Sequence, residues 1–219
     1  MVPIRVAIVD DDTLVRRALT AYVDSADDMT VVGEAEDGEQ ALGLVERLTP
    51  DVVLMDLRMP HLSGLDATST IVESTPHCRV IALTTLATAD SVVPVLRAGA
   101  AGYLLKDAAP ADILDAIRSV HDGSGALSPR VSGEIIKTLQ SSPADPAQRP
   151  RESERLSARE TEVVEQLAMG KSNSEIARSL HLSEGTVKAH LTNIMLKWNV
   201  RDRVQVLLAA ARFGIVRLH

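Results

Sequence analysis

The sequence predicts an α/β domain built on a parallel sheet, followed by a smaller all-helical domain. Short β-branched and apolar runs alternate with amphipathic segments over the first 124 residues, a pattern typical of a parallel sheet with helices on both faces. After residue 156 only helical periodicity remains. Between the two regions, residues 141–154 (SSPADPAQRPRESE) have the Pro-, Ser- and charge-rich composition of a flexible linker.

We therefore divide the 219 residues into three parts. Residues 1–124 form the α/β domain, residues 125–154 contain a candidate helix (RVSGEIIKTLQ) and the flexible linker, and residues 155–219 form the helical domain. Charge follows the same division. The residues from 151 onward carry 11 Lys and Arg against 8 Asp and Glu, whereas the first 150 carry 12 against 22. Opposite signs suggest different partners, with cations bound by the acidic half and phosphates by the basic half.

Each repeat of the first domain is a short strand followed by a helix. The strands are predicted at Ile4–Val9, Thr30–Ala35, Val52–Met55, Arg79–Leu83 and Gly102–Leu105. The helices are predicted at Leu14–Ser25, Glu39–Leu48, Gly64–Ser74, Ser91–Ala98 and Pro110–His121. Pro94 lies inside the fourth helix, where it is tolerated within about the first turn but is costly deeper in the helix.

Composition excludes several classes of protein. The single cysteine, Cys78, rules out an internal disulfide and a cysteine-rich zinc site. Aromatic residues make up 2% of the chain, too few for a platform that stacks nucleic-acid bases. No apolar run approaches the ~18 residues of a membrane span, and the N-terminus does not resemble a secretory signal. We therefore expect a soluble, cytoplasmic protein that does not contact a membrane.

Polar residues follow four of the predicted strands, at the end where a parallel sheet binds its ligands. In an open parallel sheet that site is the crevice beyond the carboxyl ends of the strands. Taken alone, the three adjacent acids after the first strand are also compatible with a solvated turn that caps the first helix. The residues that follow the first, third, fourth and fifth strands are Asp10, Asp11, Asp12, Asp56, Thr84, Thr85 and Lys106.

The chemistry of these residues indicates phosphoryl transfer. Crowded carboxylates repel one another unless a cation joins them, and Mg²⁺ typically takes one or two carboxylates plus water. Asp56 is then a candidate nucleophile toward phosphorus, which would form an aspartyl phosphate. Thr84 is suited to hydrogen-bond one phosphoryl oxygen and Lys106 to pair with another. The candidate Mg²⁺ ligands are Asp10, Asp11, Asp56 and the backbone carbonyl of Arg58.

Four segments resemble, in order and spacing, the receiver domain of two-component response regulators: IVDDDTLVRRAL, DVVLMDLRMPHLSGLD, VIALTT and AGAAGYLLKD. The resemblance covers roughly residues 2–122. It implies a flavodoxin-like (βα)5 fold with the sheet order 2-1-3-4-5. It also implies that Asp56 accepts a phosphoryl group from a sensor histidine kinase.

The resemblance implies roles for the surrounding residues as well. Asp10 and Asp11 would bind Mg²⁺, and Lys106 would contact the phosphoryl group. Thr84 and Tyr103 would be the switch pair whose reorientation reports phosphorylation.

The helical domain begins with a predicted capping box and contains a helix-turn-helix pattern. Ser157 and Glu160 have the capping-box spacing, and Met169-Gly170 is typical of a helix C-terminus. Two helices joined by a tight turn follow, SNSEIARSL and EGTVKAHLTNIMLKW, and in a helix-turn-helix the second enters the DNA major groove. Without further context the pattern also fits an ordinary helical hairpin.

The second of these helices has one apolar face and one polar face. Val187, Leu191, Ile194 and Met195 have the spacing of a buried stripe. The other face offers groups suited to phosphates, guanine edges and thymine methyl groups. Its candidate DNA contacts are Thr186, Lys188, Ala189, His190, Thr192, Asn193 and Lys197.

Residues 156–216 resemble the LuxR-type helix-turn-helix domain through LSARETEV, SNSEIA, LSEGTVKAH and NVRDRVQ. The resemblance implies sequence-specific DNA binding, with Ser174–His181 as the scaffold helix and Glu184–Lys197 as the recognition helix. Trp198 stands where a smaller aliphatic residue is commoner. The last helix is expected to pack on its own domain, to pair two copies, or both. Its candidate dimerisation residues are Val204, Leu207, Leu208 and Ala211.

Together the two resemblances imply a response regulator of the NarL/FixJ class. Such a protein is a transcription factor rather than an enzyme, and its own chemistry is limited to Mg²⁺-dependent self-phosphorylation and slow autodephosphorylation. The expected partners are a sensor histidine kinase, double-stranded promoter DNA and a second copy of the chain, which pairs on phosphorylation or DNA binding. RNA polymerase is a further candidate partner.

Two alternatives compete with this hypothesis. One is a Mg²⁺-dependent phosphatase, although its aspartyl nucleophile usually follows the first strand in a DxD pattern. The other is a constitutive DNA-binding protein whose first domain no longer switches.

Overall fold

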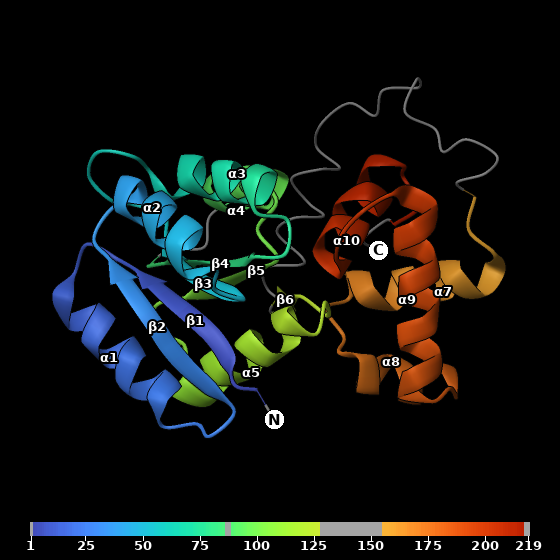
Figure 1. Ribbon diagram of the computed structural model, residues 1–219. Helices are drawn as coiled ribbons and strands as arrows, with labels where there is room; N and C mark the ends of the chain where they lie inside the picture. Colours follow the sequence, from blue (N-terminus) through green and yellow to red (C-terminus); the bar gives the residue numbers. More distant parts are fainter. Residues whose placement is uncertain (1, 86–88, 128–154, 217–219) are drawn as a thin grey trace. The chain divides into compact units, whose positions relative to one another are not determined.

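The computed structural model contains two compact units, Met1–Ala126 and Leu127–His219. The predicted helix at 130–140 and the linker at 141–154 lie outside the residues that the structure describes. The described ranges are residues 2–85, 89–127 and 155–216 (Figure 1).

A parallel sheet with helices on both faces forms the first unit (Figure 1). The sheet order β2-β1-β3-β4-β5-β6 confirms the predicted order 2-1-3-4-5. The two-residue β6 was not predicted; it extends the sheet beside β5, where the Ala126 amide donates to the Ala101 carbonyl at 3.2 Å. The strands are β1 (Ile4–Val9), β2 (Met29–Ala35), β3 (Val52–Asp56), β4 (Arg79–Thr84), β5 (Gly102–Leu105) and β6 (Ala126–Leu127).

The helices divide between the two faces of the sheet (Figure 1). One face carries α1 (Thr13–Asp24) and α5 (Pro110–His121), and the other carries α2 (Gly38–Leu48), α3 (Gly64–Ser74) and α4 (Ala89–Arg97).

Strand side chains alternate between the two layers of helices because successive residues of a strand point to opposite faces. Val6 and Ile8 join the core beneath α1 and α5, whereas Ala7 and Val9 join the core beneath α2 and α3. The predicted boundaries of the helices agree with the structure within two residues. Because α4 begins earlier than predicted, Pro94 lies beyond the first turn of the helix, where it removes one helix hydrogen bond.

Two polar residues lie within strands that were predicted to end before them. Asp56 pairs with Leu83 in the ladder between β3 and β4, and Thr84 pairs with Leu105 in the ladder between β4 and β5. The backbone of both residues is therefore held by the sheet itself rather than by the loops that follow it.

The described part of the second unit is helical. α8 and α9 are joined by a short turn that starts with His181 in the left-handed conformation, φ 53°. This arrangement confirms the predicted helix-turn-helix. The helices are α7 (Ala158–Ala168), α8 (Asn173–Leu180), α9 (Glu184–Trp198) and α10 (Arg203–Arg212). Within the described ranges, no helix of either unit combines the length and the apolar character needed to cross a membrane.

The apolar stripe of α9 differs from the prediction at its C-terminal end. Val187, Leu191 and Ile194 are buried as expected, but Met195 is only half-buried. Trp198 completes the stripe instead, one turn beyond Ile194. Its ring meets Phe213 edge-on, with centroids 5.4 Å apart, so the bulky residue at this position has an aromatic partner of its own.

The predicted capping box at the start of α7 is confirmed. The Glu160 amide donates to Ser157 Oγ at 3.3 Å, and the Ser157 amide donates to Glu160 Oε2 at 2.7 Å. A second capping box at the start of α8, between Ser172 and Glu175, was not predicted.

Glu160 also ties the start of α7 to the end of α9. Glu160 is 4% exposed, and its carboxylate accepts a hydrogen bond from Lys197 Nζ at 2.5 Å. Burial alone would raise the pKa of Glu160, but the bonds from Lys197 and Ser157 outweigh burial and hold the pKa below its ordinary value. Because the folded protein favours the ionised form, this carboxylate stabilises the fold above the unfolded pKa. That stability is lost as the pH falls through the lowered folded-state pKa.

We predict that Glu160→Gln lowers the free energy of unfolding of the helical unit by about 1–2 kcal/mol at pH 7, because the charged hydrogen bond to Lys197 is lost. The gap between variant and wild type should narrow as the pH falls below about 4.3. Urea unfolding followed by the emission of Trp198, the single tryptophan of the chain, measures this unit selectively.

Glu175→Gln is the matched control because Glu175 holds the same capping-box position in α8 but is exposed. Its effect should be much smaller, since solvent screens the site. Equal effects of the two substitutions at every pH would show that the Lys197 pair adds nothing to the cap.

Candidate functional site

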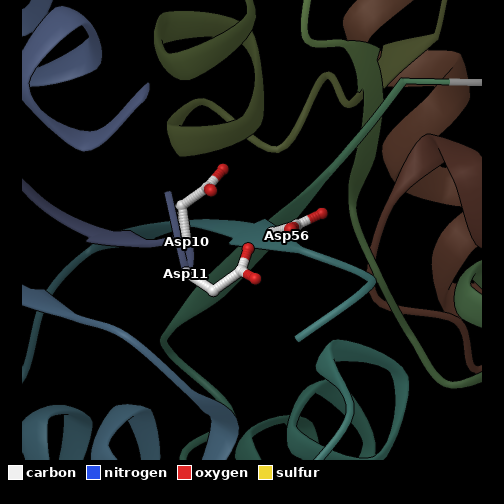
Figure 2. A group of neighbouring side chains, drawn as sticks. All are labelled: Asp10, Asp11 and Asp56. Atoms are coloured by element: carbon white, nitrogen blue, oxygen red, sulfur yellow. The ribbon is translucent and has the colours of Figure 1, made fainter. Parts of the chain in front are cut away.

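Three carboxylates gather at the carboxyl ends of β1 and β3 (Figure 2). Asp10, Asp11 and Asp56 each offer an oxygen atom, and these oxygens lie within 4.8 Å of one another. Asp10 is fully buried and Asp56 is 4% exposed, whereas Asp11 is open to solvent. Hard oxygen donors at this spacing suit Mg²⁺, so the residues fit the cation that the sequence predicted.

Asp12 has a different role from its two neighbours. Its Oδ1 accepts a hydrogen bond from the Leu14 amide at 2.8 Å and caps α1. Its own amide donates to Asp10 Oδ1 at 3.0 Å. The sequence allowed either a cation site or a helix cap for these three adjacent acids. Both are present, since two of the acids belong to the carboxylate cluster and the third caps a helix.

Lys106 supplies a positive charge between the two buried acids. Its Nζ lies 2.7 Å from Asp10 Oδ2 and 3.0 Å from Asp56 Oδ2. The Lys106 amide donates to the Thr84 carbonyl at 2.7 Å, which fixes the backbone of this lysine just beyond the end of β5. The sheet therefore places the ammonium group where two carboxylates would otherwise repel each other.

The surroundings of the cluster shift the pKa of Asp56 and of Lys106. Burial raises the pKa of Asp56 above its ordinary value, and the hydrogen bond and charge of Lys106 offset this only in part. Burial alone would lower the pKa of Lys106, but Asp10 and Asp56 outweigh it and raise the pKa, so the amine stays an ammonium ion. A carboxyl group with a perturbed pKa beside a fixed cation is a mark of a functional site.

The predicted switch pair lies on neighbouring strands. Tyr103 pairs with Ala82 and Thr84 pairs with Leu105, so Thr84 and Tyr103 are diagonal neighbours on one face of the sheet. Thr84 is 5% exposed and Tyr103 is fully buried.

Arg58 contacts the cluster through its backbone and reaches away from it with its side chain. The Arg58 amide donates to Asp56 Oδ1 at 3.3 Å. The Arg58 guanidinium donates to the Thr85 hydroxyl, which links the loop after β3 to the residue that follows β4. The prediction concerned the carbonyl oxygen of Arg58 and did not include this link.

Gly64 allows α3 to begin against the backbone of Asp56. A Cβ atom at Gly64 would lie 1.8 Å from the Asp56 carbonyl oxygen. The Gly64 amide donates to the Leu57 carbonyl at 3.3 Å and closes the intervening loop. Sequence reasoning did not single out this glycine. The available signal was a glycine at the first position of the predicted helix that follows Asp56 along the chain.

The candidate DNA contacts of α9 differ in their exposure. Lys188, Ala189, Thr192 and Asn193 are exposed and share one face, because residues four apart lie one above the other on a helix. The half-buried candidates are Thr186, His190 and Lys197. Of these, Lys197 is held in the ion pair with Glu160 described above.

Three of the four candidate dimerisation residues on α10 are buried in the single chain: Val204, Leu207 and Ala211. Leu208 alone among the four is half-exposed. α10 packs against α7 and α9, so its main apolar face stabilises its own unit.

Two family models cover most of the chain. A model of the response regulator receiver domain matches residues 6–118, and a model of the bacterial regulatory proteins of the luxR family matches residues 154–210. The chain is a response regulator of the LuxR type. It joins a receiver domain to a DNA-binding domain and belongs to a family of transcription regulators.

Similar proteins share this arrangement over their whole length. The transcriptional regulatory protein LiaR of Bacillus subtilis (strain 168) is 40% identical over 97% of this response regulator and 99% of LiaR. The crystal structure of ChrA, a response regulator in a heme-sensing two-component system, is 34% identical, covers 98% of this chain and 100% of ChrA, and has a TM-score of 0.51. The structure of the RcsB–DNA complex is 25% identical, covers 96% of this chain and 98% of RcsB, and has a TM-score of 0.57.

We predict that Gly64→Ala destabilises the receiver domain of this response regulator by about 1–3 kcal/mol, because the new methyl group overlaps the Asp56 carbonyl oxygen and must displace the loop. Thermal unfolding followed by circular dichroism measures the loss. Gly43→Ala is the matched control, since no atom lies within 4 Å of a Cβ there. In the middle of α2 it should stabilise by about 0.5–1 kcal/mol. Equal unfolding temperatures for the two variants would contradict the steric explanation.

Proposed function

We propose that Asp56 of this response regulator accepts a phosphoryl group from a sensor histidine kinase, and that the transfer controls sequence-specific DNA binding by α9. The observation that carries the proposal is the Lys106 ammonium group, held at 2.7 Å from Asp10 and 3.0 Å from Asp56 beside a third carboxylate. An acceptor oxygen, a cation-binding pair of acids and a fixed positive charge are the parts that phosphoryl transfer requires.

In the transfer step one carboxylate oxygen of Asp56 attacks phosphorus. A P–O bond forms while the P–N bond to the kinase histidine breaks, and the electron pair of the broken bond stays on the imidazole nitrogen. With acetyl phosphate as donor the P–O bond to the acetyl group breaks and acetate leaves. Slow hydrolysis by water returns Asp56 to the carboxylate and releases inorganic phosphate. This self-phosphorylation and autodephosphorylation would be the chain's own chemistry, and it turns over no separate substrate.

The neighbouring residues would hold and read the phosphoryl group. Asp10, Asp11 and Asp56, with the backbone carbonyl of Arg58, would bind Mg²⁺, which when bound neutralises charge on the phosphoryl oxygens. Lys106 would exchange its pairing with Asp56 for a phosphoryl oxygen. Thr84, at the end of the neighbouring strand, would donate its hydroxyl to another.

Phosphorylation would act on an equilibrium between two states of the receiver domain. The phosphoryl group carries about −1.5 to −2 charge in place of the single negative charge of the carboxylate, and it brings three acceptor oxygens. These changes favour the state in which Thr84 approaches the phosphoryl group and Tyr103 reorients. We propose that this state pairs two chains, with the half-exposed Leu208 as the apolar residue of α10 available for contact. A pair of chains would then bind two half-sites on double-stranded promoter DNA and present a surface to RNA polymerase.

We predict that Asp56→Asn abolishes labelling by acetyl phosphate or by a cognate kinase, because an amide cannot act as the nucleophile. Phosphate-affinity electrophoresis measures the labelled fraction of the full chain. Asp112→Asn removes an exposed carboxylate from the first turn of α5 and should label like wild type. Persistent labelling of Asp56→Asn would contradict the assignment of the phosphoacceptor.

The same proteins distinguish this function from its alternatives. Acetyl phosphate should tighten binding of the wild type to its operator and leave Asp56→Asn unchanged. Equal wild-type binding with and without acetyl phosphate would indicate a constitutive DNA-binding protein. Multiple turnovers of a small phosphomonoester would indicate a phosphatase, although here the acid lies at the end of β3 rather than β1.

We predict that Lys188→Ala weakens DNA binding and reduces the slope of log affinity against log salt by about 1 if Lys188 contacts phosphate. If it contacts a guanine edge instead, the loss should be about 1–3 kcal/mol at one base position and smaller elsewhere. Fluorescence anisotropy with labelled duplexes measures both. Arg212→Ala removes one positive charge from the exposed end of α10 and should change neither quantity. Equal effects of both variants would show that only net charge matters.

A further inference from the structure

An arginine occupies a buried position in the apolar stripe of α1. The buried residues of this helix are Arg16, Leu19 and Val23, and the spacing is that of one helix face. Arg16 is 6% exposed, about as little as Leu19 at 5%. Because a buried guanidinium group is costly unless its donors are used, the partners of Arg16 show why a charged residue stands in this stripe.

The guanidinium group of Arg16 links the backbone of the acidic cluster to the end of β2. Its Nη1 donates to the backbone carbonyl of Asp10 at 2.7 Å and approaches that of Asp11 at 3.4 Å. On its other side, Nη2 donates to Glu36 Oε1 at 2.7 Å, and Nε lies 3.4 Å from Glu34 Oε2.

These contacts fix the backbone from which two of the three clustered carboxylates project. Asp10 and Asp11 lie directly after β1, in the short connection that leads to α1. The next residue, Asp12, already caps that helix. One guanidinium nitrogen, Nη1, contacts both carbonyls, while Nη2 and Nε of the same planar group contact Glu36 and Glu34. Because guanidinium donors have a fixed geometry, these contacts restrict the rotation of both peptide units. They therefore set the direction in which the two carboxylates point.

The charge of Arg16 is already balanced on the side away from the cluster. Glu34 lies in β2 and Glu36 directly after it, and both contact the guanidinium group. An arginine flanked by two carboxylates has little net positive charge to offer Asp10 and Asp11. Its effect on the cluster should therefore come from the geometry of its hydrogen bonds.

We propose that Arg16 is a positioning residue that holds the Asp10 and Asp11 carboxylates in the arrangement that binds Mg²⁺. The inference rests on the proposed function, because it concerns the same cation site. Groups that orient the ligands of a metal typically contribute 10–100-fold to metal affinity, and Arg16 is placed to do so through the backbone. Its own contacts are with backbone carbonyls, the Thr13 hydroxyl and two glutamates, so it is not one of the proposed cation ligands.

The test uses Arg16→Met in the full chain, because methionine suits a buried helix face and removes every donor. We expect the Kd for Mg²⁺ alone, from isothermal titration calorimetry, to rise about tenfold. The Mg²⁺ concentration for half-maximal labelling by acetyl phosphate should rise equally. At saturating Mg²⁺ the labelling rate should return to within about twofold of wild type, because the nucleophile and Lys106 are unchanged.

Two further variants separate position from charge and from general damage. Arg16→Lys keeps the charge but loses the planar fork, so it should weaken Mg²⁺ binding nearly as much as Arg16→Met. Arg17→Met removes the same side chain from the neighbouring exposed position and should bind Mg²⁺ like wild type. If Arg16→Met does not fold, Arg16→Lys decides the question.

Wild-type Mg²⁺ affinity in Arg16→Met or in Arg16→Lys would overturn the inference. So would a loss of labelling that saturating Mg²⁺ does not restore in an Arg16→Met protein that unfolds like wild type, since Arg16 would then act on more than the cation site. These outcomes differ from a failure of the proposed function, in which wild type itself would neither bind Mg²⁺ nor become labelled.

Discussion

The electrostatic problem of buried carboxylates governs this molecule. Asp10 and Asp56 lie almost without solvent at the carboxyl ends of β1 and β3, where two like charges repel strongly. Lys106, which follows β5, relieves the repulsion because its Nζ lies 2.7 Å from Asp10 Oδ2 and 3.0 Å from Asp56 Oδ2. An incoming phosphoryl group would compete for the same ammonium ion, so the contact that stabilises the resting state is also the one that phosphorylation would rearrange.

Much of the fold followed from periodicity, and the differences have identifiable causes. Alternating apolar runs located each strand of the predicted order, since side-chain burial leaves a direct mark on the sequence. This apolar pattern stops where the residues of a strand become polar, although the strand itself continues. Asp56 and Thr84 were therefore assigned to loops although they pair within ladders. The sequence pattern also left Trp198 out of the buried stripe of α9. Its aromatic partner, Phe213, lies fifteen residues further along the chain, where the periodicity of α9 does not reach.

The site was predictable where chemistry and strand ends coincide, and less so where support comes from a distance. The acids and Lys106 could be found because topology brings the ends of parallel strands together. Arg16 was missed because its partners are distant in the sequence: Glu34 lies in β2 and Glu36 directly after it. A charged residue at an apolar position of the α1 stripe was the signal available. Gly64 was missed because close backbone approach leaves no pattern beyond the glycine itself.

The ion pair between Lys197 and Glu160 has a consequence for how DNA specificity can diverge. The pair anchors the C-terminal end of α9 to the cap of α7, so a substitution at either residue carries a cost in folding. The exposed residues Lys188 and Ala189, with Thr192 and Asn193 one turn further along, lie outside that anchor. If α9 contacts DNA as proposed, substitutions at these four positions would change its contacts with the operator and leave the anchor intact.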